Sequence, residues 1–283
     1  MSSIFTVSCE REASVDEVTQ LAIGRFDGVH LGHKELISLL GKSGAVLLID
    51  THQSPYLTTI AERISLIEKS VYVLDINRIK DLDGGEFVAI LQKEFKSLKQ
   101  IVVGYDFRFG KSRTSGVNEL MELFDGETLV VPEFRLDGFS VHSALIRSML
   151  FRADVSEARR LLGRAYGVCA DVIRGQGLGH KELFATINLS TSSYVLPKDG
   201  VYATRTILGT QYYDSVSFLG HRASTDGRYA FETHVLFRDL GEISGRVRVE
   251  FIKHIRDNFK FPSLAELKKQ IELDIKTAGE ILC

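Results

Sequence analysis

The 283-residue chain lacks several features that mark common classes of protein. Its three cysteines, Cys9, Cys169 and Cys283, are odd in number and widely spaced, which argues against a disulfide framework or a cysteine-based zinc cluster. No apolar run approaches the ~20 residues of a membrane span. Charged side chains at residues 10–12 occupy the place where a signal peptide would need an apolar core. These absences predict a cytoplasmic protein without membrane contact.

An excess of positive charge is also lacking. The chain has 35 basic and 37 acidic residues, which gives a formal net charge of −2. A protein that binds nucleic acid through the phosphate backbone needs a basic face, so we expect no nucleic-acid partner. A hydrophobic content of 44% with 25% charged residues is ordinary for a globular protein, and the length suits two domains.

The first half of the chain alternates two kinds of apolar pattern. Short apolar runs predict buried strands at residues 18–23, 45–50, 71–74, 100–103 and 128–131. Helical spacing predicts helices at residues 34–40, 60–69, 86–98, 117–123, 143–151 and 155–162. This alternation predicts a parallel sheet with helices on both faces. We expect this α/β domain to cover residues 1–164 and to bind its ligands beyond the carboxyl ends of the strands.

The second half has a different pattern, in which strand-like segments follow one another without helices between them. These segments are residues 166–173, 184–189, 201–206, 212–219, 229–237 and 245–255. Such a series predicts an antiparallel β-barrel over residues 165–283. One helix, from Leu264 to about Ala278, ends the chain, with Ser263 as its N-cap and Glu266 completing a capping box.

Residues 24–33, Gly-Arg-Phe-Asp-Gly-Val-His-Leu-Gly-His, join the first predicted strand to a helix. His30 and His33 share one face of the first helical turn, where backbone N–H groups and the helix dipole favour an anion. Gly28 and Gly32 let a ligand approach the backbone. The residues therefore predict a phosphate site with two imidazole donors. Two alternatives are a purely structural role for the histidines and a metal site with Asp27 as third ligand, although the spacing is not that of a zinc helix.

The same residues carry a family resemblance. The string His30-x-Gly32-His33 resembles the signature of the HxGH nucleotidyltransferases, and all ten residues resemble that of the bacterial bifunctional riboflavin kinase/FMN adenylyltransferases (FAD synthetases). The resemblance implies an enzyme that uses ATP and Mg²⁺ to phosphorylate riboflavin to FMN and to adenylylate FMN to FAD. It implies catalytic roles for His30 and His33. The nucleotide- and phosphate-binding residues that it implies are Gly24, Phe26, Asp27, Gly28, Gly32, Ser143 and Arg147.

A second turn, residues 104–113, follows the predicted strand at 100–103. Asp106 can accept hydrogen bonds from a ring or ribityl group, and Phe107 or Phe109 can stack on an aromatic ligand. Lys111 and Arg113 can bind phosphate oxygens. Taken alone, these residues also fit a basic surface loop. The turn resembles the family's Gly-x-Asp-Phe-x-Phe-Gly-x-x-Arg segment, which implies that it binds the flavin.

A third segment places Ser143 and Arg147 four residues apart at a predicted helix start, where both can face a triphosphate. The family reads Ser-Ser-Thr-x-Ile-Arg here, and this chain has His142 in place of the first Ser and Ala in place of the Thr. Asp50 and His52 stand where the family has an Asp-Pro-His-Pro-like turn, and we expect supporting roles for them.

In the second half, Gly177 and Gly179 precede a predicted strand that contains Thr186 and Asn188. Residues two apart on a strand share a face, so this hydroxyl and this amide oxygen can together bind Mg²⁺ and nucleotide phosphate. The segment resembles the riboflavin kinase signature Gly-x-Gly-Arg-x-x-Gly-Phe-Pro-Thr-Ala-Asn. The chain departs from that signature at His180, Leu183, Ala185 and Ile187.

Glu232 and His234 fall on one face of a later predicted strand. A carboxylate there can accept the proton of the riboflavin 5′-hydroxyl, and the family has a catalytic Glu in a matching Glu-x-His string. Nearby departures from the family are Phe218, Ala223 and Asn258. Two alternative functions are an adenylyltransferase whose barrel only binds flavin, and a non-catalytic flavin-binding protein.

Overall fold

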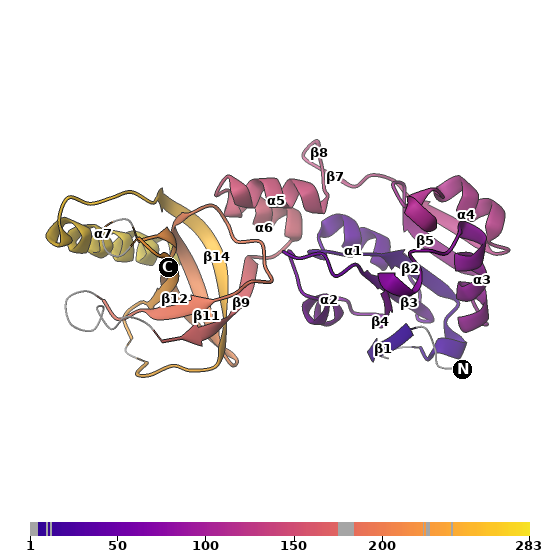
Figure 1. Cartoon of the computed structure of the whole chain (residues 1–283), viewed down its shortest axis with the longest axis horizontal. Coiled ribbons are helices and arrows are strands. Elements are labelled where there is room, and N and C mark those ends of the chain that lie inside the picture. Colours follow the sequence, from indigo (N-terminus) through magenta and orange to yellow (C-terminus); the bar gives the residue numbers. More distant parts are fainter. Residues whose placement is uncertain are drawn as a thin grey trace. The chain divides into compact units, whose positions relative to one another are not determined.

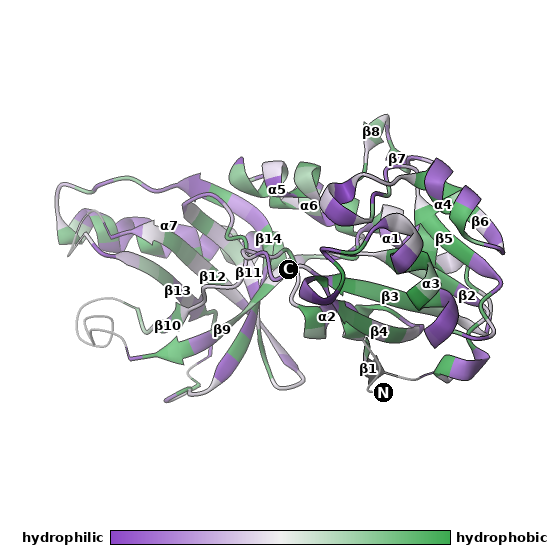
Figure 2. Cartoon of the chain, turned by 45° about the vertical axis from the view of Figure 1, so that its right-hand side comes forward, coloured by the Kyte–Doolittle hydropathy of each residue, from purple (hydrophilic) through white to green (hydrophobic). Residues whose placement is uncertain are grey.

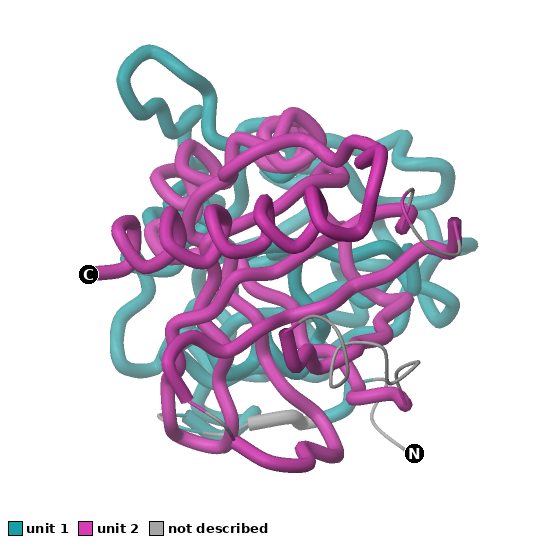
Figure 3. Tube along the Cα trace, turned by 90° about the vertical axis from the view of Figure 1, so that its left-hand side faces the viewer, with its two compact units in different colours: residues 1–143 teal, residues 144–283 magenta. Residues whose placement is uncertain are grey.

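The computed structural model describes residues 5–9, 11, 13–174, 184–222, 224, 227–238 and 240–283. The chain divides into two compact units, Met1–Ser143 and Ala144–Cys283, which are teal and magenta in Figure 3. This division falls before the expected domain boundary at residue 164. It assigns most of α5 (Ser143–Phe151) and all of α6 (Val155–Leu162) to the second unit, where α6 packs against strands of the barrel.

A mixed sheet forms the centre of the first unit, with the strand order β1-β4-β3-β2-β5-β6 among the described residues. Its strands are β1 (Phe5–Cys9), β2 (Gln20–Gly24), β3 (Gly44–Asp50), β4 (Ser70–Asp75), β5 (Gln100–Gly104) and β6 (Glu127–Val131). Strands β2 to β6 are parallel, as predicted. The sequence did not predict β1, which pairs antiparallel with β4, or the short hairpin of β7 (Arg135–Leu136) and β8 (Phe139–Ser140).

Helices cover both faces of this sheet (Figure 1). They are α1 (Leu31–Ser38), α2 (Ile60–Leu66), α3 (Gly84–Glu94) and α4 (Val117–Leu123). Successive strand residues point to opposite faces, so Leu47 packs with α3 and α4 while Leu48 packs with α1 and α2. Burial on both faces explains why the central strands are apolar along most of their length (Figure 2).

The second unit contains a closed antiparallel barrel with the strand order β10-β13-β12-β11-β14-β9, which confirms the predicted fold class. The strands are β9 (Tyr166–Ile173), β10 (Ile187–Ser190), β11 (Gly200–Leu208), β12 (Gln211–His221), β13 (Tyr229–Val235) and β14 (Arg246–Asp257). The predicted strand at 184–189 begins three residues later than expected. Each strand pairs antiparallel with its neighbours around the ring.

A cluster of hydroxyl groups lies on the inner face of the barrel strands. Its members are Thr204 and Thr206 of β11, Ser215 and Ser217 of β12, and Thr233 of β13, and all five are buried. Their oxygens bond to one another at 2.8–3.3 Å. Buried hydroxyls are tolerated when each finds a partner, so this cluster replaces apolar packing with a connected polar network.

The C-terminal helix α7 (Leu264–Leu282) packs on the outer face, where Ala278 and Leu282 meet Val201 and Ala203 of β11. Ser263 is its N-cap, as predicted, and accepts a bond from the N–H of Glu266. An ion pair joins the helix to β14.

In this pair the Arg256 guanidinium contacts both carboxylate oxygens of Asp274, with Nη2 2.7 Å from Oδ2. The Asp274 side chain is 5% exposed. Gln270 donates a further bond to Asp274 Oδ1 at 2.9 Å.

Asp274→Asn should loosen α7 from the barrel, because it leaves the Arg256 charge half buried without its counter-charge. We expect a loss of roughly 3 kcal/mol in the free energy of unfolding of the second unit, measured by denaturant titration. Lys276→Ala, which removes an exposed 4.0 Å pair with Glu280, should change it by less than about 0.5 kcal/mol. Equal effects of the two substitutions would contradict the proposed attachment.

Candidate active sites

The first candidate site is the loop between β2 and α1, at the carboxyl end of a central strand of the sheet. Its backbone is unusual, because Phe26, Gly28 and Val29 have φ values of 51°, 90° and 39°. Positive φ is unfavourable for residues other than glycine, so Phe26 and Val29 must be held in place by contacts elsewhere. Both side chains are almost fully buried.

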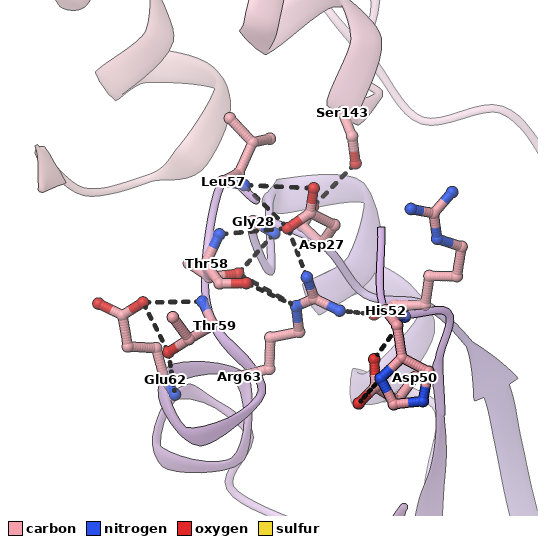
Figure 4. Close-up of polar contacts among 11 residues, drawn as sticks. Asp27, Gly28, Asp50, His52, Leu57, Thr58, Thr59, Glu62, Arg63 and Ser143 are labelled. Atoms are coloured by element: carbon pink, nitrogen blue, oxygen red, sulfur yellow. Dashed lines mark hydrogen bonds and ion pairs between the residues drawn. The ribbon is translucent and has the colours of Figure 1, made fainter. Parts of the chain in front are cut away.

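Asp27 is the residue that ties this loop down (Figure 4). Its Oδ1 lies 2.7 Å from Nη2 of Arg63 on α2, and it accepts bonds from the backbone N–H groups of Leu57 and Thr58 at 3.1 and 3.2 Å. The Asp27 and Arg63 side chains are 5% and 2% exposed. The carboxylate of Asp27 is thus bound by the protein itself, and its expected place in the nucleotide site stays a prediction.

Three further bonds join the loop to other segments of the chain. The N–H of Gly28 donates to Thr58 Oγ1 at 2.8 Å, and Arg63 Nη1 donates to the carbonyl of Arg25 at 3.0 Å. On the other side, Ser143 Oγ donates to the carbonyl of Asp27 at 2.8 Å (Figure 4). Arg63, which binds both Asp27 and the carbonyl of Arg25, was not predicted from the sequence as a site residue.

The two histidines lie where the loop enters α1. His30 is the N-cap, and its Nδ1 accepts a bond from the backbone N–H of His33 at 3.3 Å. An Nδ1 that accepts this bond carries no proton, so the neutral ring has its N–H at Nε2. The rings of His30 and His33 stack with centroids 3.5 Å apart, and the rings of Phe26 and His33 pack edge to face with centroids 5.2 Å apart.

Close packing around these rings accounts for the absence of a side chain at Gly32 and Gly24. A Cβ at Gly32 would lie 3.2 Å from the carbonyl oxygen of Val141 and 3.3 Å from His30 Nδ1, and one at Gly24 would lie 3.2 Å from the Phe26 ring. Both glycines thus make room for protein atoms. Ser143 binds the loop that carries these residues, and Arg147 lies four residues further along the chain, in the second unit.

The alternative metal site is not supported. Asp27, its expected third ligand, is bound by Arg63. Across the described part of the chain, no three His, Cys, Asp or Glu side chains gather in a way that could hold a metal ion.

The predicted flavin loop follows β5, the neighbour of β2 in the sheet. Phe109 is 7% exposed and packs in the hydrophobic core beside Phe87 and Phe107, at centroid distances of 5.6 and 5.5 Å. The expected stacking of Phe107 or Phe109 on a ligand stays a prediction, and in this structure the Phe109 ring packs in the core. Phe107 is partly buried against the same core, whereas the side chains of Asp106, Lys111 and Arg113 are exposed.

A group of three polar residues lies at the carboxyl ends of β3 and β4. His52 Nε2 is 2.9 Å from Asp75 Oδ1, and His52 Nδ1 is 3.4 Å from Asp50 Oδ2. The hydrogen bond to Asp75 and the charge of Asp50 raise the pKa of His52 above its ordinary value of 6.5. Asp50 and His52 were expected from the sequence, and Asp75 was not.

The second candidate site lies on the barrel. Asn188 of β10 and Glu232 of β13 are directly paired across the two strands. Thr186, whose side chain is exposed, immediately precedes β10. His234 Nδ1 contacts the carbonyl of Ala185 at 2.7 Å, which attaches this segment to β13. Gly177 and Gly179 lie outside the described residues.

Arg222, which the sequence reasoning missed, connects the two paired residues. Its Nε and Nη2 lie 3.1 and 2.6 Å from Glu232 Oε1, and Nη2 is also 2.9 Å from Asn188 Oδ1. Phe218 is the residue paired with Glu232 on the other side, across β12 and β13. Asn258 donates to the carbonyl of His221 at 2.8 Å, next to Arg222 in the chain.

Comparison with known proteins gives matches to both halves. A family model described as FAD synthetase matches residues 44–145, and one described as riboflavin kinase matches residues 162–282. The bifunctional riboflavin kinase/FMN adenylyltransferase of Haemophilus influenzae is 30% identical, over 91% of this chain and 92% of that protein. The protein of the same description from Escherichia coli K12 is 31% identical, over 92% and 91%.

A solved structure described as a macrolide-efflux protein from Streptococcus pneumoniae is also similar. Its TM-score is 0.82 at 25% identity, with 94% of this chain and 97% of that chain covered. In the described part of this chain, no helix has the length and apolar character to cross a membrane.

Arg63→Met should unfold the first unit more easily, because it leaves the Asp27 carboxylate buried without its counter-charge. We expect a loss of roughly 3–5 kcal/mol in the free energy of unfolding of this unit. Arg135→Met, which breaks an exposed pair with Glu133, serves as the matched control and should cost less than about 1 kcal/mol. Denaturant titration of both variants measures the difference, and a cost for Arg63→Met no larger than the control's would refute the role of the pair.

The raised pKa of His52 determines how the stability of the first unit changes with pH. The contact with Asp75 contributes its full stability below about pH 6.5, the ordinary histidine pKa, and loses it as the pH rises through the higher pKa of the folded state. We expect an NMR titration of the His52 ring to have its midpoint above 6.5 and Asp75→Asn to lower that midpoint. An unchanged midpoint in the variant would contradict this account.

Proposed function

The chain belongs to the family of bifunctional riboflavin kinase/FMN adenylyltransferases, and from this premise we propose which of its residues perform each reaction. The protein phosphorylates riboflavin to FMN with ATP, and it transfers the adenylyl group of a second ATP to FMN to give FAD. The observation that carries the residue assignment is the stacked pair of imidazoles at the start of α1.

We propose that His30 and His33 donate hydrogen bonds to the phosphate that is transferred during adenylylation. An FMN phosphate oxygen bonds to the α-phosphorus of ATP, the bond to the bridging oxygen breaks, and pyrophosphate leaves. Negative charge grows on the oxygens of the α-phosphate, and N–H donors held rigidly beside it stabilise that charge. The Nε2 proton of His30 and the backbone N–H groups of α1 supply donors at this position.

The remaining groups of the first reaction hold the substrates. We assign Lys111, Arg113 and Arg147 to phosphate binding, since each offers a cationic side chain. We assign Asp106 and Phe107 to the flavin, with Phe109 packed against Phe107. Gly24, Phe26, Asp27, Gly28, Gly32 and Ser143 belong to the same site, where they fix the loop that carries His30. Arg63 joins them, because it binds the Asp27 carboxylate. Little covalent chemistry is needed beyond this positioning.

For the kinase reaction we propose Glu232 as the general base. It accepts the proton of the riboflavin 5′-hydroxyl while that oxygen bonds to the γ-phosphorus of ATP and ADP leaves. In this proposal the phosphates of ATP bind at Thr186 and at Asn188, which is paired with Glu232 across the two strands. Their amide and hydroxyl oxygens are hard donors that would hold Mg²⁺, and Asn188 Oδ1 would do so while it also accepts the bond from Arg222. Bound Mg²⁺ supplies charge neutralisation to the ATP phosphates in both reactions.

The proposed domain boundary stays near residue 164, because the riboflavin kinase match begins at residue 162 and the FAD synthetase match ends at residue 145. A cytoplasmic location and the lack of a nucleic-acid partner stay predictions from the sequence. Gly177 and Gly179 stay proposed members of the kinase site.

Two substitutions should separate the reactions. His33→Asn should remove most FAD formation from FMN and leave FMN formation from riboflavin intact, since the two sites use different residues. Glu232→Gln should lower FMN formation by about 100-fold or more and leave FAD formation from FMN intact. The measurement is a chromatographic product assay with Mg-ATP and either riboflavin or FMN.

Each variant is the control for the other, because each must retain one full activity to show that it is folded. Full FAD formation by His33→Asn would overturn the first assignment. Full FMN formation by Glu232→Gln would overturn the second.

A further inference from the structure

Backbone hydrogen bonds fix the position of Arg222 at one end of the barrel. Its N–H donates to the carbonyl of Arg228 at 2.9 Å, and its carbonyl accepts from Gly227 at 3.1 Å. The preceding carbonyl, of His221, accepts the 2.8 Å bond from Asn258. The guanidinium therefore leaves the chain from a defined point just beyond β12.

From that point the guanidinium reaches two strands. Nη2 contacts Oε1 of Glu232 on β13 and Oδ1 of Asn188 on β10, so a single nitrogen bridges both residues. Nε adds a second bond to the same Glu232 oxygen. The side chains of Arg222 and Glu232 are 19% and 23% exposed, so the pair is partly shielded from solvent. Charge-assisted bonds of this kind restrict the orientation of a carboxylate.

The geometry has a direct consequence for Glu232. Both bonds from Arg222 end on Oε1, which leaves Oε2 as the oxygen that Arg222 does not engage. A guanidinium is only a donor, so Arg222 cannot take the substrate proton in place of Glu232. It can fix which oxygen of Glu232 faces the hydroxyl and how far the base lies from Asn188.

We propose that Arg222 is a positioning residue of riboflavin phosphorylation, which clamps the carboxylate of Glu232 to the amide of Asn188 and thereby presents Oε2 to the 5′-hydroxyl. This inference rests on the proposed role of Glu232 as the general base. It assigns Arg222 no contact with riboflavin or ATP. The alternative is an ion pair that only stabilises the barrel.

The two roles differ in what a substitution does to catalysis. Arg222→Gln should lower kcat for FMN formation by about 100-fold, because the base loses its orientation, while KM for riboflavin and ATP changes less than about threefold. Arg222→Lys retains the charge but not the two-nitrogen geometry, and should restore kcat to within about tenfold of the unmodified chain. FAD formation from FMN should be unchanged in both variants.

Arg205→Gln is the matched control, since it removes an arginine of the same barrel that pairs with Asp214 at 3.3 Å. It should leave both activities unchanged. A second test combines Arg222→Gln with Glu232→Gln. Because Arg222 acts through Glu232, Arg222→Gln should lower kcat much less in the Glu232→Gln background than in the unmodified chain.

The outcomes separate this inference from the proposed function. Three results would each overturn the positioning role. They are a full kcat in Arg222→Gln, a loss of kcat in Arg205→Gln as large as that in Arg222→Gln, and a loss from Arg222→Gln that is as large in the double variant as in the single one. Retained FMN formation in Glu232→Gln would overturn the assignment of the base, and the positioning role with it. The expected pattern, with kcat lost, KM kept and adenylylation intact, supports both.

Discussion

The buried ion pair between Asp27 and Arg63 is the interaction on which the first site depends. The loop that carries His30 holds Phe26 and Val29 at positive φ, a conformation that costs energy of order 1 kcal/mol or more per residue. Asp27 offsets this by binding Arg63 and two backbone N–H groups at once. Neither charge can be buried alone, so the pair forms only when the loop and α2 are both in place. The positions of the imidazoles follow from that cooperative assembly.

The second site is built in a different way, from the register of regular strands. Along β13, Thr233 points into the barrel and joins the buried hydroxyl cluster, while Glu232 points outward beside Asn188. A shift of the β13 register by one residue would exchange the two faces. It would place the Glu232 carboxylate inside the barrel, beside five hydroxyl groups that carry no positive charge. The hydroxyl cluster therefore specifies the register that presents Glu232. Arg222 then sets the finer orientation of the same carboxylate.

Periodicity was sufficient to predict most of the fold, because strands buried on both faces and amphipathic helices leave clear patterns. It missed β1, whose pairing with β4 at the edge of the sheet is a tertiary contact. At the sites, the sequence predicted His30, His33, Asn188 and Glu232. It missed Arg63, which binds Asp27, and Arg222, which binds Asn188 and Glu232. A signal for Arg63 did exist, since it falls on the apolar stripe of α2 between Ile60 and Ile64. No such signal marks Arg222, because its two partners come from strands that only barrel closure brings together.

Asp27 and Phe109 are predicted site residues whose side chains make their contacts within the protein. Each lies in a motif that matches the family, yet each is buried and holds a loop against the protein core. A motif residue that supports a loop is required whatever the loop binds, so its presence says little about activity. Positions on the outer face of the barrel where this chain departs from the family say more about its activity. Phe218 lies directly across from Glu232, where the family has Asn, and it packs against the cluster that joins α7 to the barrel. That position thus contributes packing in this chain, and among the residues described here it is Arg222 that supplies the polar contact to Glu232.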